Sequence, residues 1–265
     1  MIIHDFDPVL IDLGILQIRW YSLAYVFGIL VGWIYGKAII KKQILNENQN
    51  NYLINFDDLI GYIIIGVIVG GRLGYVIFYD PQFYLENLSE IFKIWNGGMS
   101  FHGGFIGVII ATYIFSNFKK LNYKIYFDVI CCVSPIGLFL GRIANFINGE
   151  LYGIPTEKPW GIIFPKIDNV IRHPSQIYEA LLEGFVLFII LNFLARKKII
   201  GNGLISSLFL ILYGTFRVVS EQFREPDKHV GYIFEYLSMG SLLSIVMIFF
   251  GLLLVLKIIF NEKNR

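Results

Sequence analysis

Charged side chains are scarce in this sequence, and cysteines are scarcer still. Asp, Glu, Lys and Arg make up 16% of the 265 residues, whereas soluble globular chains carry about 25%, so an ordinary water-soluble domain is excluded. The net charge of +2 is too small to indicate a nucleic-acid-binding surface. The two cysteines, Cys131 and Cys132, are adjacent and would point apart on a helix, which argues against a disulfide. The cysteines and histidines show no metal-ligand spacing. We therefore expect no metal and no cofactor, and the small net charge leads us to expect no nucleic acid partner.

Long hydrophobic runs are what the sequence has in abundance. Hydrophobic residues make up 56% of the chain, and they gather in seven runs long enough to cross a bilayer, which takes about 20 residues of helix. The runs are continuous rather than alternating, which excludes a membrane β-barrel. In lipid, a helix satisfies its own backbone hydrogen bonds. We therefore predict an all-α integral membrane protein, a single transmembrane domain over residues 1–265, with spans near 18–40, 57–79, 99–118, 125–147, 175–195, 203–223 and 237–260.

The distribution of Lys and Arg between the connections predicts the orientation of the chain. Short loops rich in basic residues stay in the cytoplasm. One set of connections is short and holds twelve basic residues: Lys37, Lys41, Lys42, Lys119, Lys120, Lys124, Arg196, Lys197, Lys198, Lys257, Lys263 and Arg265. The longer connections hold seven: Arg19, Lys93, Lys158, Lys166, Arg172, Arg224 and Lys228. We therefore place the C-terminus in the cytoplasm and the N-terminus outside.

Two further features concern the outer side. The connection 148–174 contains four prolines and several glycines, a composition typical of non-helical structure, so we predict a small outer cap between the fourth and fifth helices. The first residues lack the basic start of a cleavable signal peptide. The first hydrophobic segment is therefore expected to stay in the protein.

Three arginines, Arg72, Arg142 and Arg217, fall inside predicted spans. An arginine at the centre of a bilayer costs about 2.5–3.5 kcal/mol on insertion scales, so each needs a partner, a water-filled cavity or a route to the interface. With the orientation above, all three lie toward the outer leaflet at a similar depth, and so does His102. Snorkelling does not explain this clustering, whereas an anion held near the outer leaflet does. A buried network of structural ion pairs is the alternative.

The neighbours of two of these arginines support an anion site. Tyr213, Arg217 and Glu221 are spaced i, i+4, i+8 on one helix face, with Arg224 close to the same line. On another span Arg142 and Asn145 share a face, and they are followed at the membrane border by Asn148, Gly149 and Glu150. A guanidinium binds phosphate through two parallel hydrogen bonds, which an ammonium cannot do. Arginines that face one cavity in lipid therefore indicate a phospholipid headgroup site.

Glycines mark the packing around this region. Gly66, Gly70 and Gly74 repeat every fourth residue on the second span, which lets another helix backbone approach closely. His102 is preceded by Gly97 and Gly98 and followed by two more glycines. Such a histidine is either a general base or an ordinary interfacial side chain, and the sequence leaves both open.

Four segments resemble the motifs of the bacterial prolipoprotein diacylglyceryl transferase family. They are residues 141–153 (GRIANFINGELYG), 173–179 (HPSQIYE), 97–104 (GGMSFHGG) and 213–217 (YGTFR). The likeness extends from about residue 6 to the last span. Two departures are visible: Ala144 stands where the family often has glycine, and segment 154–172 is shorter than in some members. The second departure puts in doubt how far details of the cap carry over.

The resemblance implies an activity and its substrates. The donor would be phosphatidylglycerol, the acceptor the lipobox cysteine thiol of a prolipoprotein signal peptide, and the products a thioether and glycerol 1-phosphate, in the first step of lipoprotein maturation. The enzyme would lie in the bacterial cell (plasma or inner) membrane as one catalytic domain, with its active site toward the outer leaflet. The resemblance implies that Arg142 and Arg217 match the arginines regarded as central in the family. It also implies that the family's other site residues correspond in this chain to Tyr21, His102, Asn145, Glu150, Gly153, Tyr213, Glu221 and Arg224. From their positions we add Arg72 and Asn148 as substrate-binding candidates.

A mechanism follows as a hypothesis. Arg142 would bind the headgroup phosphate, and Arg217, oriented by Glu221, would stabilise both the leaving phosphate and the thiolate. His102 is one candidate for the base; alternatively the arginines lower the thiol pKa unaided.

Three other classes fit the sequence less well. A transporter would be expected to show internal repeats, and none is visible. A retinal protein would need a buried lysine, but Lys257 is too near the cytoplasmic end of its span. A phosphatidyl transferase would ordinarily use a metal-binding aspartate cluster, which the spans lack.

Overall fold

The computed structural model describes residues 2–14, 17–45, 48–197, 200–226, 232–233 and 237–263. Within these residues seven helical segments are long and apolar enough to cross a membrane. They are α1 (Trp20–Gln43), α2 (Gln49–Phe78), α4 (Phe101–Phe118), α5 (Tyr123–Asn148), the segment Ser175–Ala195, α8 (Leu204–Glu221) and α9 (Met239–Lys263). The predicted all-α class with seven spans is thus confirmed, and the chain is a multi-pass membrane protein. Its orientation stays a prediction, and Lys198, Lys228 and Arg265 lie outside the described residues.

The chain divides into two compact units. The first unit comprises residues 1–36 and 128–265, and the second comprises residues 37–127. That the chain forms a single catalytic domain stays a prediction.

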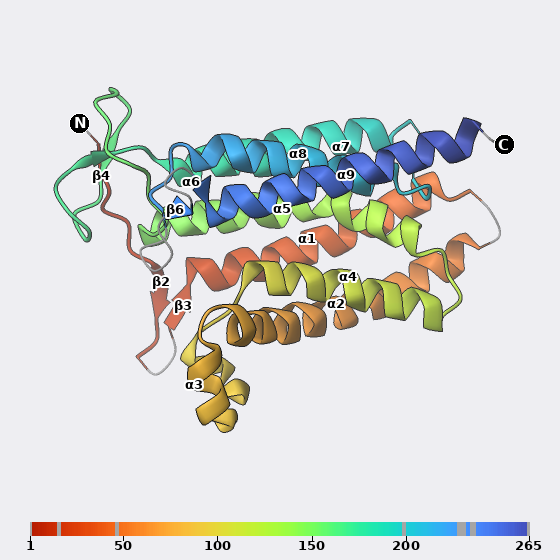
Figure 1. Cartoon of the computed structure of the whole chain (residues 1–265), viewed down its shortest axis with the longest axis horizontal. Coiled ribbons are helices and arrows are strands. Elements are labelled where there is room, and N and C mark those ends of the chain that lie inside the picture. Colours follow the sequence, from red (N-terminus) through yellow and green to blue (C-terminus); the bar gives the residue numbers. More distant parts are fainter. Residues whose placement is uncertain are drawn as a thin grey trace. The chain divides into compact units, whose positions relative to one another are not determined.

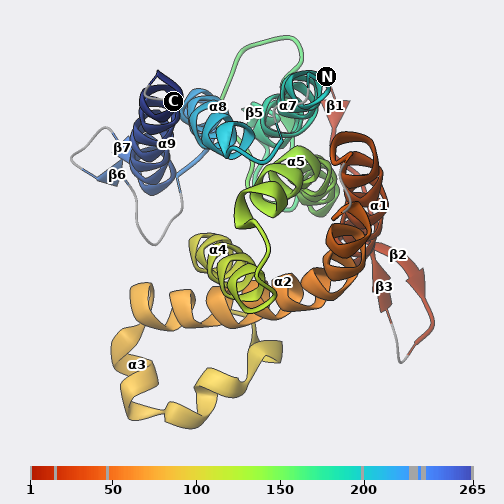
Figure 2. The same ribbon diagram turned by 90° about the vertical axis from the view of Figure 1, so that its right-hand side faces the viewer.

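The second unit is built on the packing of α2 against α4 (Figures 1 and 2). Its helices touch through glycine: a Cβ added to Gly66 would lie 2.6 Å from the carbonyl oxygen of Gly107, and one on Gly74 would lie 2.7 Å from the Cα of Gly103. Only helices without side chains at these positions can approach so closely. The close approach predicted from the repeated glycines of α2 is confirmed, and its partner is α4.

Between α2 and α4 the chain forms three short helices, α3 (Pro81–Glu86), η1 (Leu88–Phe92) and η2 (Ile94–Asn96). Figure 2 shows them extending away from the α2–α4 pair. Several large apolar side chains of this segment are exposed, among them Phe92 and Trp95.

In the first unit, α8 lies along α9 (Figures 1 and 2). Glycine again sets the spacing: a Cβ on Gly214 of α8 would lie 2.8 Å from the carbonyl oxygen of Ser244 in α9. The fifth span is made of α6 (Ser175–Glu179), the π-helix η3 (Ala180–Val186) and α7 (Leu187–Ala195). Gly184 of η3 brings this span against α5, because its Cβ would lie 2.6 Å from the Cβ of Phe139.

Helix α8 is capped by a carboxylate from another helix. The fully buried Asp128 of α5 accepts hydrogen bonds from the backbone N–H groups of Gly201 (2.8 Å), Gly203 (3.1 Å) and Ser206 (2.9 Å), and also from the Ser206 hydroxyl. The first N–H groups of a helix have no partner within it, and a carboxylate there also interacts favourably with the helix dipole.

A small non-helical cap follows α5. Residues 149–174 contain the strands β4 (Ile162–Ile163) and β5 (Ile171–Arg172), which join the N-terminal strand β1 (Ile2–Ile3) in a sheet of order β1-β4-β5. Strand β1 is parallel to β4, and β4 is antiparallel to β5. A second N-terminal ribbon pairs β2 (Val9–Asp12) with β3 (Gln17–Arg19), and β6 (Tyr232–Ile233) pairs with β7 (Leu237–Ser238). The cap is therefore present where the prolines predicted it, and its place on the outer face stays a prediction.

Candidate active site

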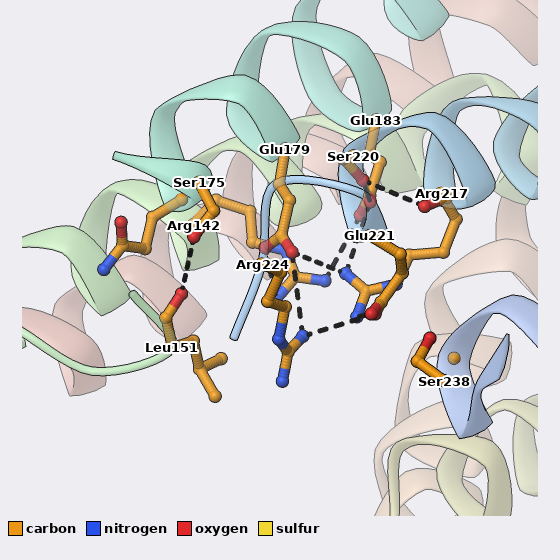
Figure 3. A network of polar contacts seen from close by, with 12 residues as sticks. Arg142, Leu151, Ser175, Glu179, Glu183, Arg217, Ser220, Glu221, Arg224 and Ser238 are labelled. Carbon is orange, nitrogen blue, oxygen red and sulfur yellow. Dashed lines mark hydrogen bonds and ion pairs between the residues drawn. The ribbon is translucent and has the colours of Figure 1, made fainter. Parts of the chain in front are cut away.

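Arginine and glutamate side chains from three membrane spans meet in the first unit (Figure 3). Arg142 lies six residues before the end of α5, about 9 Å along the axis at 1.5 Å per residue. Arg217 lies four residues before the end of α8, or about 6 Å. Their partners Glu179 and Glu183 lie near the start of the fifth span. The meeting point is therefore close to the cap end of these helices.

Two carboxylates bridge the two arginines. Glu179 contacts Arg142 Nη1 through Oε2 at 3.1 Å and Arg217 Nη1 through Oε1 at 2.8 Å. Glu183 contacts Arg142 Nη2 through Oε2 at 3.2 Å and Arg217 Nη1 through Oε1 at 3.3 Å. Both glutamates are fully buried. The guanidinium groups of two separate helices thus share one pair of carboxylates.

The network continues along α8. Arg217 Nη2 bonds Glu221, and the Ser220 hydroxyl donates to Glu183 Oε1 at 3.0 Å. Arg224 Nη1 lies 3.6 Å from Glu179 Oε1 and 3.8 Å from Glu221 Oε1. The formal charges of the three arginines and three glutamates in this cluster cancel. Buried ion pairs of this kind contribute little net stability, and ionisable groups inside membrane spans mark functional sites.

The π-helix supplies one of the bridging carboxylates. Glu179 is the last residue of α6, and the π-helix Ala180–Val186 begins directly after it. Glu183 lies in the middle of this π-helix. A π-turn holds more residues than an α-turn, so it changes the direction of Glu183 relative to Glu179. Single π-turns inside α-helices occur frequently at functional sites.

A second polar cluster surrounds Glu150, just after α5. Glu150 Oε1 accepts hydrogen bonds from Asn145 Nδ2 at 2.7 Å and from Asn148 Nδ2 at 3.2 Å. The backbone carbonyl of Glu150 accepts from Gln176 Nε2 at 2.7 Å, and Ser175 donates to the carbonyl of Leu151 at 2.9 Å. The start of the fifth span is therefore tied to the loop that carries Glu150.

Three other predicted site residues belong to the first unit. Tyr21 lies at the start of α1, with its hydroxyl 3.3 Å from that of Tyr25. Tyr213 is buried one turn before Arg217, with its ring stacked on Phe209. Gly153 lies in the cap and pairs through its backbone with Arg224.

Arg72 and His102 belong to the second unit. Arg72 is buried, and its guanidinium donates to backbone carbonyls at 2.5–3.3 Å, those of Glu90, Ile91, Lys93, Gly97 and Gly98. In the structure it therefore organises segment 88–98, and its role as a phosphate ligand stays a prediction. His102 is half-buried in the first turn of α4, where Ser100 caps the helix by accepting from the Gly103 N–H at 3.2 Å. Its role as a base stays a prediction.

Sequence reasoning missed Glu179 and Glu183 as site residues. The signal was present, because both are carboxylates inside the predicted span 175–195 and their i, i+4 spacing places them close together. Carboxylates in a membrane need cationic partners. The arginines of two neighbouring spans, Arg142 and Arg217, were the candidates.

In the part of the chain that the structure describes, seven helices able to cross a membrane and a buried cluster of guanidinium and carboxylate groups define an integral membrane protein with a polar centre. Residues 8–257 match the family model of prolipoprotein diacylglyceryl transferase. The chain belongs to this family, so it is a transferase, and the resemblance noted in its sequence is confirmed.

Curated relatives are similar to this protein over nearly the whole length of its chain. The phosphatidylglycerol–prolipoprotein diacylglyceryl transferase of Rickettsia bellii (strain OSU 85-389) is 50% identical over 259 residues, 97% of each chain. The Rickettsia felis protein of the same name is 49% identical over 260 residues, covering 96% of this chain and 98% of the relative. That of Rhodopseudomonas palustris (strain ATCC BAA-98 / CGA009) is 46% identical over 255 residues, 95% of this chain and 89% of the relative.

Proposed function

We propose that this protein transfers the diacylglyceryl group of phosphatidylglycerol to the lipobox cysteine of a prolipoprotein, from a site that opens toward the outer leaflet of the bacterial cell membrane. The names of its relatives support the substrates. The observation that carries the proposal is the sharing of Glu179 and Glu183 by Arg142 and Arg217. Two guanidiniums held this close together can bind the oxygens of one phosphate.

The reaction is a displacement at carbon. The cysteine sulfur, as thiolate, attacks the glyceryl carbon that bears the phosphate, and an S–C bond forms. The C–O bond to the phosphate breaks, and its electron pair stays on the departing oxygen. The thiol proton is lost to a base or to solvent. The products are a thioether and glycerol 1-phosphate, a phosphate monoester with one more negative charge than the diester.

The arginines act on that developing charge. A unit negative charge about 4 Å from a guanidinium gains about 4 kcal/mol at an effective dielectric constant of about 20. Arg142 binds the headgroup phosphate, and Arg217 stabilises the leaving oxygens. Glu179, Glu183 and Glu221 hold the guanidiniums in place before the substrate arrives, so little reorganisation accompanies the reaction. Asn145, Asn148 and Glu150 offer amide and carboxylate groups to the glycerol end of the headgroup.

Two routes can produce the thiolate. A free cysteine has a pKa of about 8.5 and is mostly protonated at neutral pH. Either His102 removes the proton, or the arginines lower the thiol pKa enough by themselves. Replacing His102 with glutamine separates the two routes, because retained turnover would eliminate histidine as the base.

Two labels in one lipid test the proposed function. The protein in lipid nanodiscs is given phosphatidylglycerol with one label on an acyl chain and another on the phosphate, together with a lipobox peptide. We expect the acyl label, but not the phosphate label, on the peptide cysteine. A peptide with serine in place of that cysteine is the matched control and should stay unlabelled. Phosphate label on the peptide would instead indicate phosphatidyl transfer, and absence of any label would contradict the proposal.

A further inference from the structure

Arg172 lies in the cap, outside the network of arginines and glutamates, and its buried guanidinium binds several partners of its own. It is 9% exposed. Asp168 accepts from its Nε at 3.2 Å and from its Nη2 at 2.6 Å. Its Nη1 donates both to the backbone carbonyl of Gly153 and to Glu225 Oε2, each at 3.1 Å. Its guanidinium also lies 4.9 Å from the centre of the Tyr152 ring. Hydrogen bonding to Asp168 holds the pKa of Arg172 above its usual range, so this residue stays charged.

Arg172 and three of its partners, Tyr152, Gly153 and Glu225, lie on three chain segments that run side by side. We call these segments, residues 152–155, 171–173 and 223–225, the cap ribbon. Segment 152–155 is in the middle. On one side the Gly153 N–H donates to the His173 carbonyl at 2.9 Å. On the other side the Ile154 N–H donates to the Phe223 carbonyl at 3.0 Å, and the Glu225 N–H donates to the Tyr152 carbonyl at 3.1 Å.

The ribbon explains the glycine at position 153. A Cβ at Gly153 would collide with the carbonyl oxygens of His173 and Phe223, one on each side. Glycine therefore lets the two outer segments close on the middle one. Arg172 then spans the ribbon from 171–173 through the Gly153 carbonyl to Glu225.

Arg224 stands between the ribbon and the arginine–glutamate network. Its backbone pairs with Gly153, and its guanidinium approaches Glu179 and Glu221, the same carboxylates that hold Arg217. Its neighbour Glu225 is held by Arg172. Whatever fixes segment 223–225 therefore also fixes the point from which the Arg224 side chain enters the network.

We infer that Arg172 is a positioning residue for the transfer reaction, which sets the place of Arg224 by tying Glu225 and the Gly153 carbonyl to the cap. It does not touch the carboxylates that hold Arg142 and Arg217 in the contacts described for its side chain. The inference rests on the proposed function, because Arg224 is taken to act in the transfer. A cap residue of purely local importance would instead stabilise residues 152–173 and leave segment 223–226 unaffected.

Hydrogen exchange read by mass spectrometry tests the inference without any reference to activity. In Arg172→Gln we expect faster amide exchange in peptides covering 223–226 as well as 152–155. Lys158→Gln, which removes an exposed cation elsewhere in the cap, is the matched control and should exchange as wild type in both. Should Arg172→Gln fail to fold, Glu225→Gln replaces it. We then expect faster amide exchange than in wild type in residues 223–226 and a wild-type rate in residues 166–172. Wild-type exchange in 223–226 would overturn the inference.

A double-mutant cycle then connects Arg172 to the reaction. Of the bonds that Arg172→Gln removes, the charge-assisted hydrogen bond to Glu225 is the one that reaches segment 223–225, and its loss should lower kcat/KM by about 10- to 100-fold. If Arg172 acts through Arg224, the double variant Arg172→Gln/Arg224→Gln is no worse than Arg224→Gln alone. The same kinetic parameter, KM for lipid or kcat, should change in both single variants. Additive losses would overturn the inference. A wild-type protein that transfers no label would refute the proposed function instead, and the exchange data would still decide the role of Arg172.

Discussion

Replacing Arg217 with lysine separates charge from geometry at the centre of the network. The arginine uses Nη1 to reach Glu179 at 2.8 Å and Glu183 at 3.3 Å, while Nη2 bonds Glu221. A lysine keeps the positive charge, but its single ammonium cannot reproduce a planar fork that spans three carboxylates. It would move toward one of them and away from the leaving oxygens of the phosphate.

The size of the effect follows from the kind of interaction lost. Removing one preorganised donor from a developing oxyanion costs about 2.7–4 kcal/mol, or about 10²–10³ in kcat. We expect a fall of that size in kcat for Arg217→Lys. In the proposed mechanism Arg142 binds the headgroup in this variant too, so KM for phosphatidylglycerol should change much less.

The assay is the initial rate of acyl-label transfer to a lipobox peptide in nanodiscs, over a range of lipid content. Arg196→Lys is the matched control, since Arg196 is exposed just beyond α7, far along the fifth span from Glu179 and Glu183. Thermal unfolding of each variant checks that the fold is intact. Wild-type kcat in a folded Arg217→Lys protein would refute the argument that the guanidinium fork is needed.

Two further changes test the packing around the sites. Gly240→Ala would place a Cβ 2.9 Å from the Glu221 carboxyl carbon and push Glu221 away from Arg217, so we expect the transfer rate to fall by about 5- to 150-fold, the equivalent of about 1–3 kcal/mol of overpacking. The matched control is Gly137→Ala, whose Cβ meets nothing within 4 Å and whose transfer rate should stay near wild type. Equal transfer rates in the two variants would contradict this prediction. Arg72→Met should leave buried carbonyls of residues 90–98 without a hydrogen-bond donor, and each one that water does not reach should cost about 1–3 kcal/mol of stability. We therefore expect faster amide exchange in this segment. Unchanged exchange with a raised KM for lipid would instead make Arg72 a phosphate ligand.

The spans could be predicted from sequence because a bilayer imposes a simple requirement of length and apolarity. The predicted span 175–195 coincides with the observed helical segment, and the span 99–118 begins two residues before α4. The largest difference is in α2, predicted to begin near residue 57 and observed to begin at Gln49. Its first two turns include Asn50, Asn51 and Asn55, so hydropathy detects only the more apolar part of the helix, whereas the backbone hydrogen bonds begin before it.

The site was predicted in part, for a reason that the network makes plain. The arginines stand out because a lone cation in lipid demands an explanation. Their partners Glu179 and Glu183 lie on a helix distant in sequence, and pairing them with Arg142 and Arg217 requires knowing which helices are neighbours. The π-turn after Glu179 is also invisible to a 3.6-residue period. The five carbonyls that surround Arg72 belong to the short helix η1 and to the residues after it, whose path no periodicity gives.

Asp128 acts on the site from a distance, by preventing α8 from sliding. Its carboxylate holds the N–H of Ser206, eleven residues or about 16 Å of helix before Arg217. A slip of α8 by one residue would shift Arg217 by about 1.5 Å and rotate it by about 100°, enough to carry its guanidinium away from Glu179 and Glu183. The anchored end of the helix therefore determines whether the arginine at its far end can meet the two carboxylates at all.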